Sequence, residues 1–200
     1  MAACAVTDFG GAGCYNVPMR ISTKFTYEEL QHFPNDGNRY EIVDGELFVT
    51  PSPIPLHQRI VGNLYARLWD HVKKHNVGEV YVAPLDVVFT DSTVLEPDIL
   101  FVSRARLHII GEKNLSGPPD LVVEVLSESS SRLDHEIKPK QYALHGVPEF
   151  WRIDPWVKTI EVFRLHEGNY ELAASLIPGD ELTSVLFPGL CLPIASLWER

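Results

Sequence analysis

The sequence predicts one mixed α/β domain in which helices pack on a β-sheet, and three observations favour this fold class. Short runs rich in β-branched and aromatic residues, bounded by Pro, Gly, Asn and Asp, recur along the chain and are typical of strands. One long segment, residues 56–75, carries apolar residues at helical spacing. The 200 residues suit a single domain of ordinary size. We place this domain at residues 21–200, after a flexible tail of residues 1–20 in which Met19 is an alternative start.

The first elements are a short helix and a hairpin. Thr26 followed three residues later by Glu29 predicts a capping box in a helix over residues 25–30. The pair Asp44-Gly45 predicts a type I′ turn in a hairpin over residues 39–50. Glu41 and Glu46 then lie together on one face of the hairpin. Either this face is a solvated edge, or one of the two acids, for which we prefer Glu41, contributes to a site.

The clearest helix spans residues 56–75, and its apolar stripe predicts burial in the core. The stripe comprises Leu56, Ile60, Val61, Leu64, Leu68, Trp69 and Val72. His57 opens this helix, where an imidazole near a metal orients a water or accepts a proton close to neutral pH. A helix-terminal histidine at the protein surface is the alternative.

The remaining elements alternate between strands and helices. We expect strands at 79–90, where Pro84 indicates an edge or a bulge, and at 94–102, 121–126 and 149–154. We expect helices at 104–110 and 132–145, and a C-terminal β-hairpin at 159–165 and 170–177. Trp151 is expected in the core, and Lys138 and Tyr142 lie four apart on one helix face.

Two of the predicted buried strands contain a carboxylate. Asp98 lies in the run Val94–Val102, and Glu124 lies in the run Leu121–Leu126. Acids are depleted from buried strands because an unpaired charge is costly there. Two such acids in neighbouring segments indicate a site for a positive group, most simply a divalent metal ion. Taken alone, a carboxylate at a strand end is usually solvated or paired with Lys or Arg, and this reading applies to each acid considered by itself.

Composition limits the classes of function. The net charge of −10 argues against a simple nucleic-acid binder, because phosphate neutralisation usually requires a basic surface. Site carboxylates that await a metal account for only part of that charge. The odd set of Cys4, Cys14 and Cys191 indicates reduced thiols in a cytoplasmic protein. No apolar run approaches the roughly 18 residues that a membrane helix requires.

The ordered set of motifs resembles the Uma2 family of restriction-endonuclease-like proteins, within the PD-(D/E)XK nuclease superfamily. The likeness spans roughly residues 25–197 and is carried by the motifs that follow. They are Tyr40–Glu46, Pro53–His57, Glu96-Pro97-Asp98, Pro119–Ser127, Asp134 with Lys138 and Tyr142, Gly146–Trp151 and Asp154-Pro155.

The resemblance implies a restriction-endonuclease-like mixed β-sheet flanked by helices, and a metal-dependent endonuclease that cuts nucleic acid, with DNA as the expected substrate. Mg²⁺ or Mn²⁺ is then held by Asp98, Glu124 and the backbone carbonyl of Val125. Lys138 and Glu41 complete the catalytic set, with His57 and Glu46 as accessory residues. A homodimer is compatible with double-strand cutting.

The chain departs from the superfamily pattern at one position. The lysine usually stands two residues after the second acid, where this chain has Leu126, so the resemblance implies that Lys138 supplies the amine from the following helix.

Two other functions are considered. Leu126 and the acidic charge are compatible with a catalytically silent binding or assembly module of the same fold. A glycosidase acid pair needs sugar-stacking aromatic residues around both acids, and the flanking Ile, Val and Leu argue against it.

Overall fold

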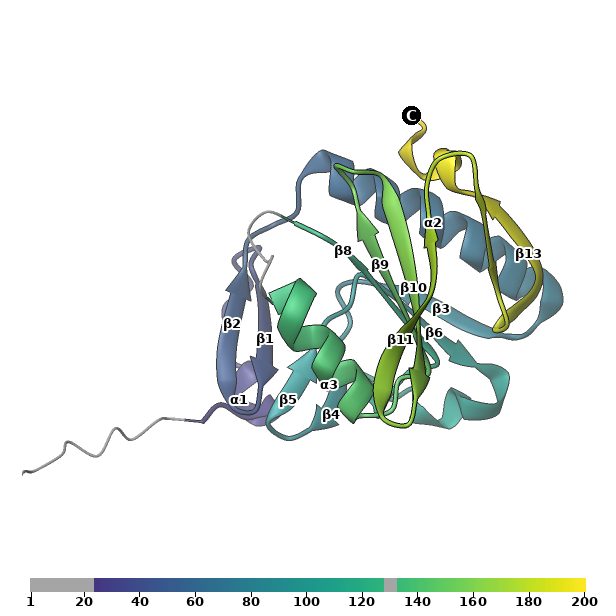
Figure 1. The fold of residues 1–200 in the computed structure, drawn as a ribbon. Helices are drawn as coiled ribbons and strands as arrows, with labels where there is room; N and C mark the ends of the chain where they lie inside the picture. The colour runs from purple at the N-terminus through teal and green to yellow at the C-terminus, as the bar shows by residue number, and fades with distance from the viewer. Residues whose placement is uncertain (1–23, 128–132) are drawn as a thin grey trace, which may run out of the picture.

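The computed structural model describes residues 24–127 and 133–200 (Figure 1), so the predicted tail at 1–20 lies outside the described residues. Its helices are α1 (Tyr27–Leu30), α2 (Pro55–His75), α3 (Lys138–Leu144), the 3₁₀ helices η1 (Arg104–Ile109) and η3 (Ile194–Trp198), and the π-helix η2 (Leu133–Ile137). Its strands are β1 (Arg39–Val43), β2 (Glu46–Thr50), β3 (Gly78–Val82), β4 (Val87–Thr90), β5 (Thr93–Leu95), β6 (Ile99–Ser103), β7 (Leu115–Ser116), β8 (Leu121–Val125), β9 (Glu149–Asp154), β10 (Thr159–His166), β11 (Asn169–Leu176), β12 (Glu181–Ser184) and β13 (Phe187–Pro193).

Within the described residues the strands form two large sheets and one small sheet. The order is β2-β1-β5-β4-β7 in a five-stranded sheet, β11-β10-β9-β8-β6-β3 in a six-stranded sheet, and β12-β13 in a separate pair. Both large sheets are mixed, because β8 pairs with β9 and β4 pairs with β7 in parallel while the other pairings are antiparallel. The prediction of a mixed sheet flanked by helices is confirmed.

The N-terminal elements form as their local sequences predict. Thr26 caps α1 and Glu29 completes the capping box. The β1–β2 hairpin turns at Asp44 and Gly45, which both have positive φ angles of 52° and 84°, as a type I′ turn requires. Glu41 pairs with Phe48, which is the register that a two-residue turn at Asp44-Gly45 sets. The C-terminal hairpin of β10 and β11 is also confirmed.

Strand β8 is buried on both faces and organises the core. Val123 and Val125 pack with the apolar stripe of α2. Val122, on the opposite face, packs with Tyr142 of α3. The six-stranded sheet therefore has α2 on one face and α3 on the other (Figure 1). Because side chains alternate along a strand, Glu124 shares the α3 face with Val122.

The structure corrects two predicted strands, each of which is divided between the two large sheets. Residues 79–90 form β3 in one sheet and β4 in the other, with a bend at the cis peptide bond between Ala83 and Pro84. Residues 94–102 form β5 and β6, which separate at Pro97. Proline has no N–H for a strand ladder, so it favours a break in both cases.

One predicted core residue lies on the surface. Trp69 is 45% exposed on α2, whereas Ile60, Leu64 and Leu68 of the same stripe are fully buried. Its helical neighbours Leu68 and Val72 are the residues that pack in the core at this position, so Trp69 lies beside the apolar stripe rather than within it. Trp151, in contrast, is completely buried as predicted.

Among the described residues, no helix combines the length and apolar character that a bilayer crossing demands.

Candidate functional site

The candidate site lies where the chain crosses from the five-stranded to the six-stranded sheet. β5 and β6 are joined by Glu96-Pro97-Asp98, so Asp98 stands at the entry to β6. Ile99 pairs with Val123 in the antiparallel β6–β8 ladder, and the next position along both strands places Asp98 opposite Glu124. The backbone N–H of Val125 donates to Oδ2 of Asp98 at 2.8 Å. The two acids singled out in the sequence are therefore neighbours across two adjacent strands.

Lys138, the first residue of α3, contacts three carboxylates at once. Its Nζ lies 3.0 Å from Oε1 of Glu41, 3.2 Å from Oε1 of Glu124 and 3.3 Å from Oδ1 of Asp134. The side chain is almost completely buried, with 1% of the residue exposed. The hydroxyl of Tyr142, one turn further along α3, donates to Oε1 of Glu124 at 2.5 Å. The helix therefore brings both an ammonium and a hydroxyl to Glu124.

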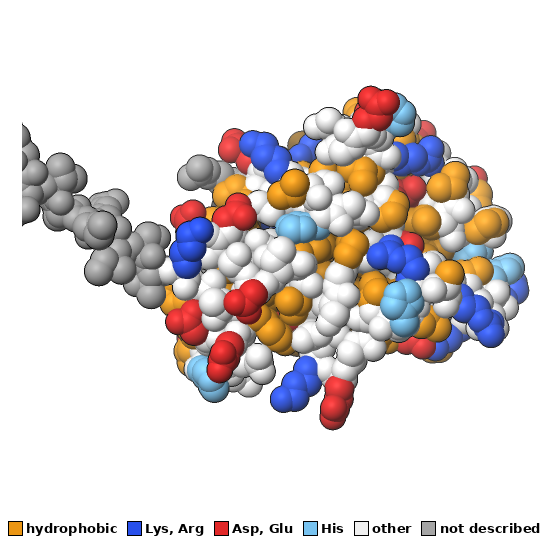
Figure 2. Space-filling view, turned by 90° about the horizontal axis from the view of Figure 1, so that it is seen from below, with side chains coloured by type: hydrophobic (Ala, Val, Ile, Leu, Met, Phe, Trp, Pro, Cys, Tyr) orange, Lys and Arg blue, Asp and Glu red, His pale blue; other side chains and the backbone are white. Residues whose placement is uncertain are grey.

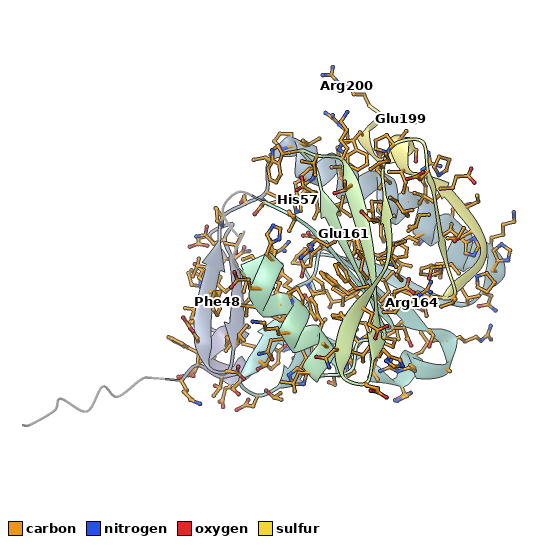
Figure 3. All side chains as sticks on the ribbon, in the orientation of Figure 1. Phe48, His57, Glu161, Arg164, Glu199 and Arg200 are labelled. Carbon is orange, nitrogen blue, oxygen red and sulfur yellow. The ribbon has the colours of Figure 1, made fainter. Side chains whose placement is uncertain are left out.

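Arg39 and His57 hold Asp98 from the other side. The Arg39 guanidinium donates to Oδ1 of Asp98 at 3.1 Å and pairs with Oε1 of Glu96 at 2.8 Å. Nε2 of His57 lies 3.1 Å from Oδ2 of Asp98. His57 stands in the first turn of α2, at the end of that helix nearer the β1–β2 hairpin (Figure 3). Arg39, at the start of β1, thus ties the hairpin to the acid.

The charged states of Asp98 and Lys138 are maintained by their partners. Burial disfavours the Asp98 carboxylate, but the His57 hydrogen bond and the Arg39 charge outweigh it, so its pKa lies well below the ordinary value. Burial also disfavours the Lys138 ammonium. The charges of Glu124, Glu41 and Asp134 reverse this effect and hold the pKa of Lys138 well above its ordinary value. Both groups are therefore ionised at neutral pH.

Two other acids in the cluster bind protons more readily than usual. Burial raises the pKa of Glu124 to about 8, against the Lys138 charge and with the help of Asp98 and Asp134. Burial likewise raises the pKa of Glu96 to about 7, against the Arg39 charge. Among the residues that the structure describes, the contacts join more acidic side chains than permanent cations, since Arg39 and Lys138 face Glu41, Glu96, Asp98, Glu124 and Asp134. The cluster therefore carries an excess of negative charge that either protons or a further cation can neutralise.

The donor chemistry of this cluster fits the hard divalent cation that the resemblance implies. Asp98, Glu124 and the Val125 carbonyl offer oxygen atoms, which Mg²⁺ and Mn²⁺ prefer. Oε2 of Glu41 is buried and has no hydrogen-bond partner within the described part of the chain. Within residues 24–127 and 133–200, no three side chains of His, Cys, Asp or Glu converge as a metal-ligand set. Mg²⁺ does not require three ligating side chains, because it is commonly held by one or two carboxylates and keeps several water molecules.

The cluster opens into a hollow of about 560 Å³. Its lining includes Arg39, His57, Glu96, Asp98, Glu124, Val125, Asp134 and Lys138, together with a wall formed by Pro51, Ser52, Pro53, Ile54, Pro84 and Trp156. We refer to this space as the hollow. Asp98 and Glu124 are only 2% and 1% exposed although they line it. A substrate must therefore enter the hollow to reach them.

The structure brings together most of the residues that the sequence singled out. Asp98, Glu124, Lys138, Glu41 and His57 are in direct or shared contact, and Val125 adjoins them. Glu46, in contrast, is exposed at the hairpin turn and does not line the hollow. Glu41 is buried because the β1 face that carries it packs toward α3, so the hairpin has no solvated edge at this position.

Four members of the cluster had no role assigned from the sequence: Arg39, Glu96, Asp134 and Tyr142. Asp134 precedes Lys138 by four residues, an acid-to-base spacing typical of helical ion pairs, and that spacing is a usable signal. Tyr142 follows Lys138 by the same spacing, on the same helix face. Arg39 and Glu96 join the cluster through contacts between distant segments, and no local pattern indicates them.

The fold and the site together define a mixed α/β domain of nuclease-like architecture with a buried acid–lysine cluster. A similar solved structure is described as that of a "putative nuclease belonging to DUF820" from Anabaena variabilis ATCC 29413. It is 22% identical, covers 87% of this chain and 97% of its own, and superposes with a TM-score of 0.72. The family model of Uma2, described as "Putative restriction endonuclease", matches residues 26–195, and the chain belongs to that family. Among curated proteins no match was found.

Proposed function

We propose that this protein is a metal-dependent nuclease that hydrolyses phosphodiester bonds, with DNA as its expected substrate. The observation that carries the proposal is the meeting of Asp98, Glu124 and Lys138, from three separate segments, at one hollow. Membership of the Uma2 family supports it. Asp98, Glu124 and the Val125 carbonyl would hold Mg²⁺ or Mn²⁺. When bound, this cation would lower the pKa of a water molecule that it coordinates, and it would neutralise negative charge on the phosphoryl oxygens.

The chain's own residues orient and charge the site. The Lys138 ammonium offsets negative charge that develops on the phosphoryl group, because three carboxylates keep it protonated. Glu41 and Asp134 position that ammonium. His57 and Arg39 keep Asp98 ionised and fix its orientation toward the hollow.

Replacing Glu124 by Gln tests this function, and Glu46→Gln is the matched control. Both residues are glutamates, but only Glu124 lies in the cluster. Cleavage of supercoiled plasmid and of circular single-stranded DNA is measured with Mg²⁺, Mn²⁺ or EDTA. We expect Glu124→Gln to lose more than about 100-fold in rate, since a ligand contributes more than its outer-shell partners. Glu46→Gln is expected to cut normally. Full cutting by Glu124→Gln, or cutting in EDTA, contradicts the proposal.

A second candidate function is a catalytically silent binding module. The observation that favours it is that both oxygens of Asp98 already accept hydrogen bonds, from Arg39 and from Val125. Calorimetry with Mn²⁺ separates the two functions. A nuclease site gives binding heat that Asp98→Asn removes, whereas a silent module gives no heat that depends on this carboxylate.

A further inference from the structure

The reacting groups are recessed, which limits the shape of a substrate. Asp98, Glu124 and Lys138 line the hollow, yet each is at most 2% exposed. A phosphate on the surface of a rigid duplex is held beside its neighbours and its paired strand. A phosphate of an unpaired strand can enter the hollow with its own sugar and base. A space of about 560 Å³ falls in the usual range for clefts and cavities that bind small ligands.

An aromatic side chain stands in the wall of this hollow. Trp156 is 44% exposed and lines the same space as the acids. Single exposed apolar residues are common on protein surfaces and need no function. Trp156 differs because Ile54, itself 50% exposed, and Pro51, Pro53 and Pro84 also line the hollow. Together they give an apolar wall beside a charged interior.

The turn that carries Trp156 is held in place by hydrogen bonds. The backbone N–H groups of Trp156 and Val157 donate to Oδ1 of Asp154 at 2.9 and 3.0 Å. Nε1 of Trp198 donates to the carbonyl of Pro155 at 3.1 Å. The indole therefore projects from a turn between β9 and β10 whose backbone is already ordered.

The charged side chains around the hollow argue against a surface that binds a long nucleic-acid duplex. Among the described residues that line the hollow, the Lys and Arg side chains are Arg39 and Lys138, and both are paired with carboxylates. The lower face of the molecule, shown in Figure 2 and turned away from the end that carries His57 in Figure 3, likewise has Lys and Arg interspersed with Asp and Glu. The net charge of the chain is −10. Duplex binding draws mainly on phosphate neutralisation, whereas an unpaired strand also gains from stacking of its bases on aromatic side chains, which is sequence-tolerant.

We propose that Trp156 stacks on the base of an unpaired nucleotide whose phosphate enters the hollow, so that the substrate is single-stranded or locally unpaired nucleic acid. This inference rests on the proposed nuclease function and adds its substrate class. Trp156 is a binding residue, and the acid–lysine cluster remains responsible for the chemistry.

Trp156→Ala tests the inference, and Trp69→Ala is the matched control. Trp69 is equally exposed, at 45%, but lies on α2 outside the hollow. The full chain carrying Glu124→Gln is titrated with a fluorescent ten-residue dT oligonucleotide, and with a duplex of mixed sequence, in the presence of Mg²⁺. We expect Trp156→Ala to weaken single-strand binding about 5- to 150-fold. Trp69→Ala is expected to bind normally, and Trp156→Phe, which keeps an aromatic face, to retain most of the affinity.

Cleavage assays then test the inference about Trp156 and the substrate class separately from the nuclease function. Faster cutting of single-stranded than of duplex substrate, with the loss expected for Trp156→Ala, supports the inference. Cleavage of single strands that is unchanged in Trp156→Ala overturns the role of Trp156 and leaves the nuclease function intact. Faster cutting of duplex overturns the substrate class. Absence of Mg²⁺-dependent cleavage of either substrate overturns the nuclease function itself, and this inference with it.

Discussion

Nζ of Lys138 and Oε1 of Glu41 lie 3.0 Å apart inside the protein, and this buried ion pair joins α3 to the β1–β2 hairpin. Lys138 also contacts Glu124 and Asp134. Lys138→Ala should therefore leave three buried acidic side chains without their shared cation. Breaking a buried pair in this way typically costs about 3–5 kcal/mol in the free energy of unfolding.

Urea unfolding at pH 7 without metal measures this cost, and Lys113→Ala is the control because Lys113 is exposed. We expect the control to change the free energy of unfolding by no more than about 0.5 kcal/mol. A Lys138→Ala protein as stable as the control would show that the cluster does not need the ammonium.

The stability of the metal-free protein should depend on pH through Glu124. Its pKa rises from 4.5 to about 8 on folding. The protonated acid is thus favoured in the folded state, and its contribution is fully present below pH 4.5 and lost as the pH rises through about 8. Glu96, whose pKa rises to about 7, acts in the same direction.

Melting temperatures between pH 5 and 9 check this dependence. We expect the melting temperature to fall with rising pH in the wild type and to fall less in Glu124→Gln, whose amide does not titrate. Mg²⁺ should restore most of the loss at pH 8 because it replaces the proton as the neutralising charge. A wild-type curve that matches that of Glu124→Gln would contradict the prediction.

His57 should act on metal affinity by orienting Asp98, since its Nε2 lies 3.1 Å from Oδ2 of that acid. Outer-shell partners of this kind are commonly worth about 10- to 100-fold in metal affinity. We expect His57→Ala to weaken Mn²⁺ binding by such a factor in calorimetry. His75→Ala, at the exposed far end of the same helix, should leave binding unchanged. Equal affinities for the two variants would remove the positioning role.

Two glycines of the fold should respond oppositely to alanine. A Cβ on Gly78 would lie 2.2 Å from the carbonyl oxygen of Val102, in the β3–β6 pairing, so Gly78→Ala must displace a strand. A Cβ on Gly62, in α2, meets nothing within 4 Å. Gly62→Ala should therefore stabilise the protein by about 0.5–1 kcal/mol through its higher helix propensity. Thermal unfolding of both variants gives the comparison, and destabilisation by Gly62→Ala would contradict it.

The sequence predicts best those features that depend on neighbouring residues. The turn at Asp44-Gly45, the capping box of Thr26 and Glu29, and the register of Glu41 with Phe48 all follow from short-range geometry. The acids Asp98 and Glu124 stand out because a charge in a buried strand is unusual. These signals were sufficient to predict a mixed α/β domain and the acid pair.

Features that depend on contacts between distant segments could not be predicted. Pro97 favours a break in the strand, but it does not indicate that β5 and β6 belong to different sheets. Arg39 resembles any surface cation at a strand start until the fold brings it to Asp98. Trp69 fits the helical period but falls beside the packed stripe. The family resemblance, rather than local pattern, indicated Lys138 as the amine.

The passage of the chain at Glu96-Pro97-Asp98 makes the candidate site the joint between the two large sheets. Its acids and cations also connect the two sheets, since Arg39 and Glu41 belong to one sheet, Glu124 belongs to the other, and Asp98 directly precedes a strand of that other sheet. Substitutions among these residues therefore change both the candidate site and the contact between the two sheets. A substitution in the acid–lysine cluster will also weaken the contact between the two large sheets. Residues such as Trp156, which lies on a turn, can be substituted without affecting that contact.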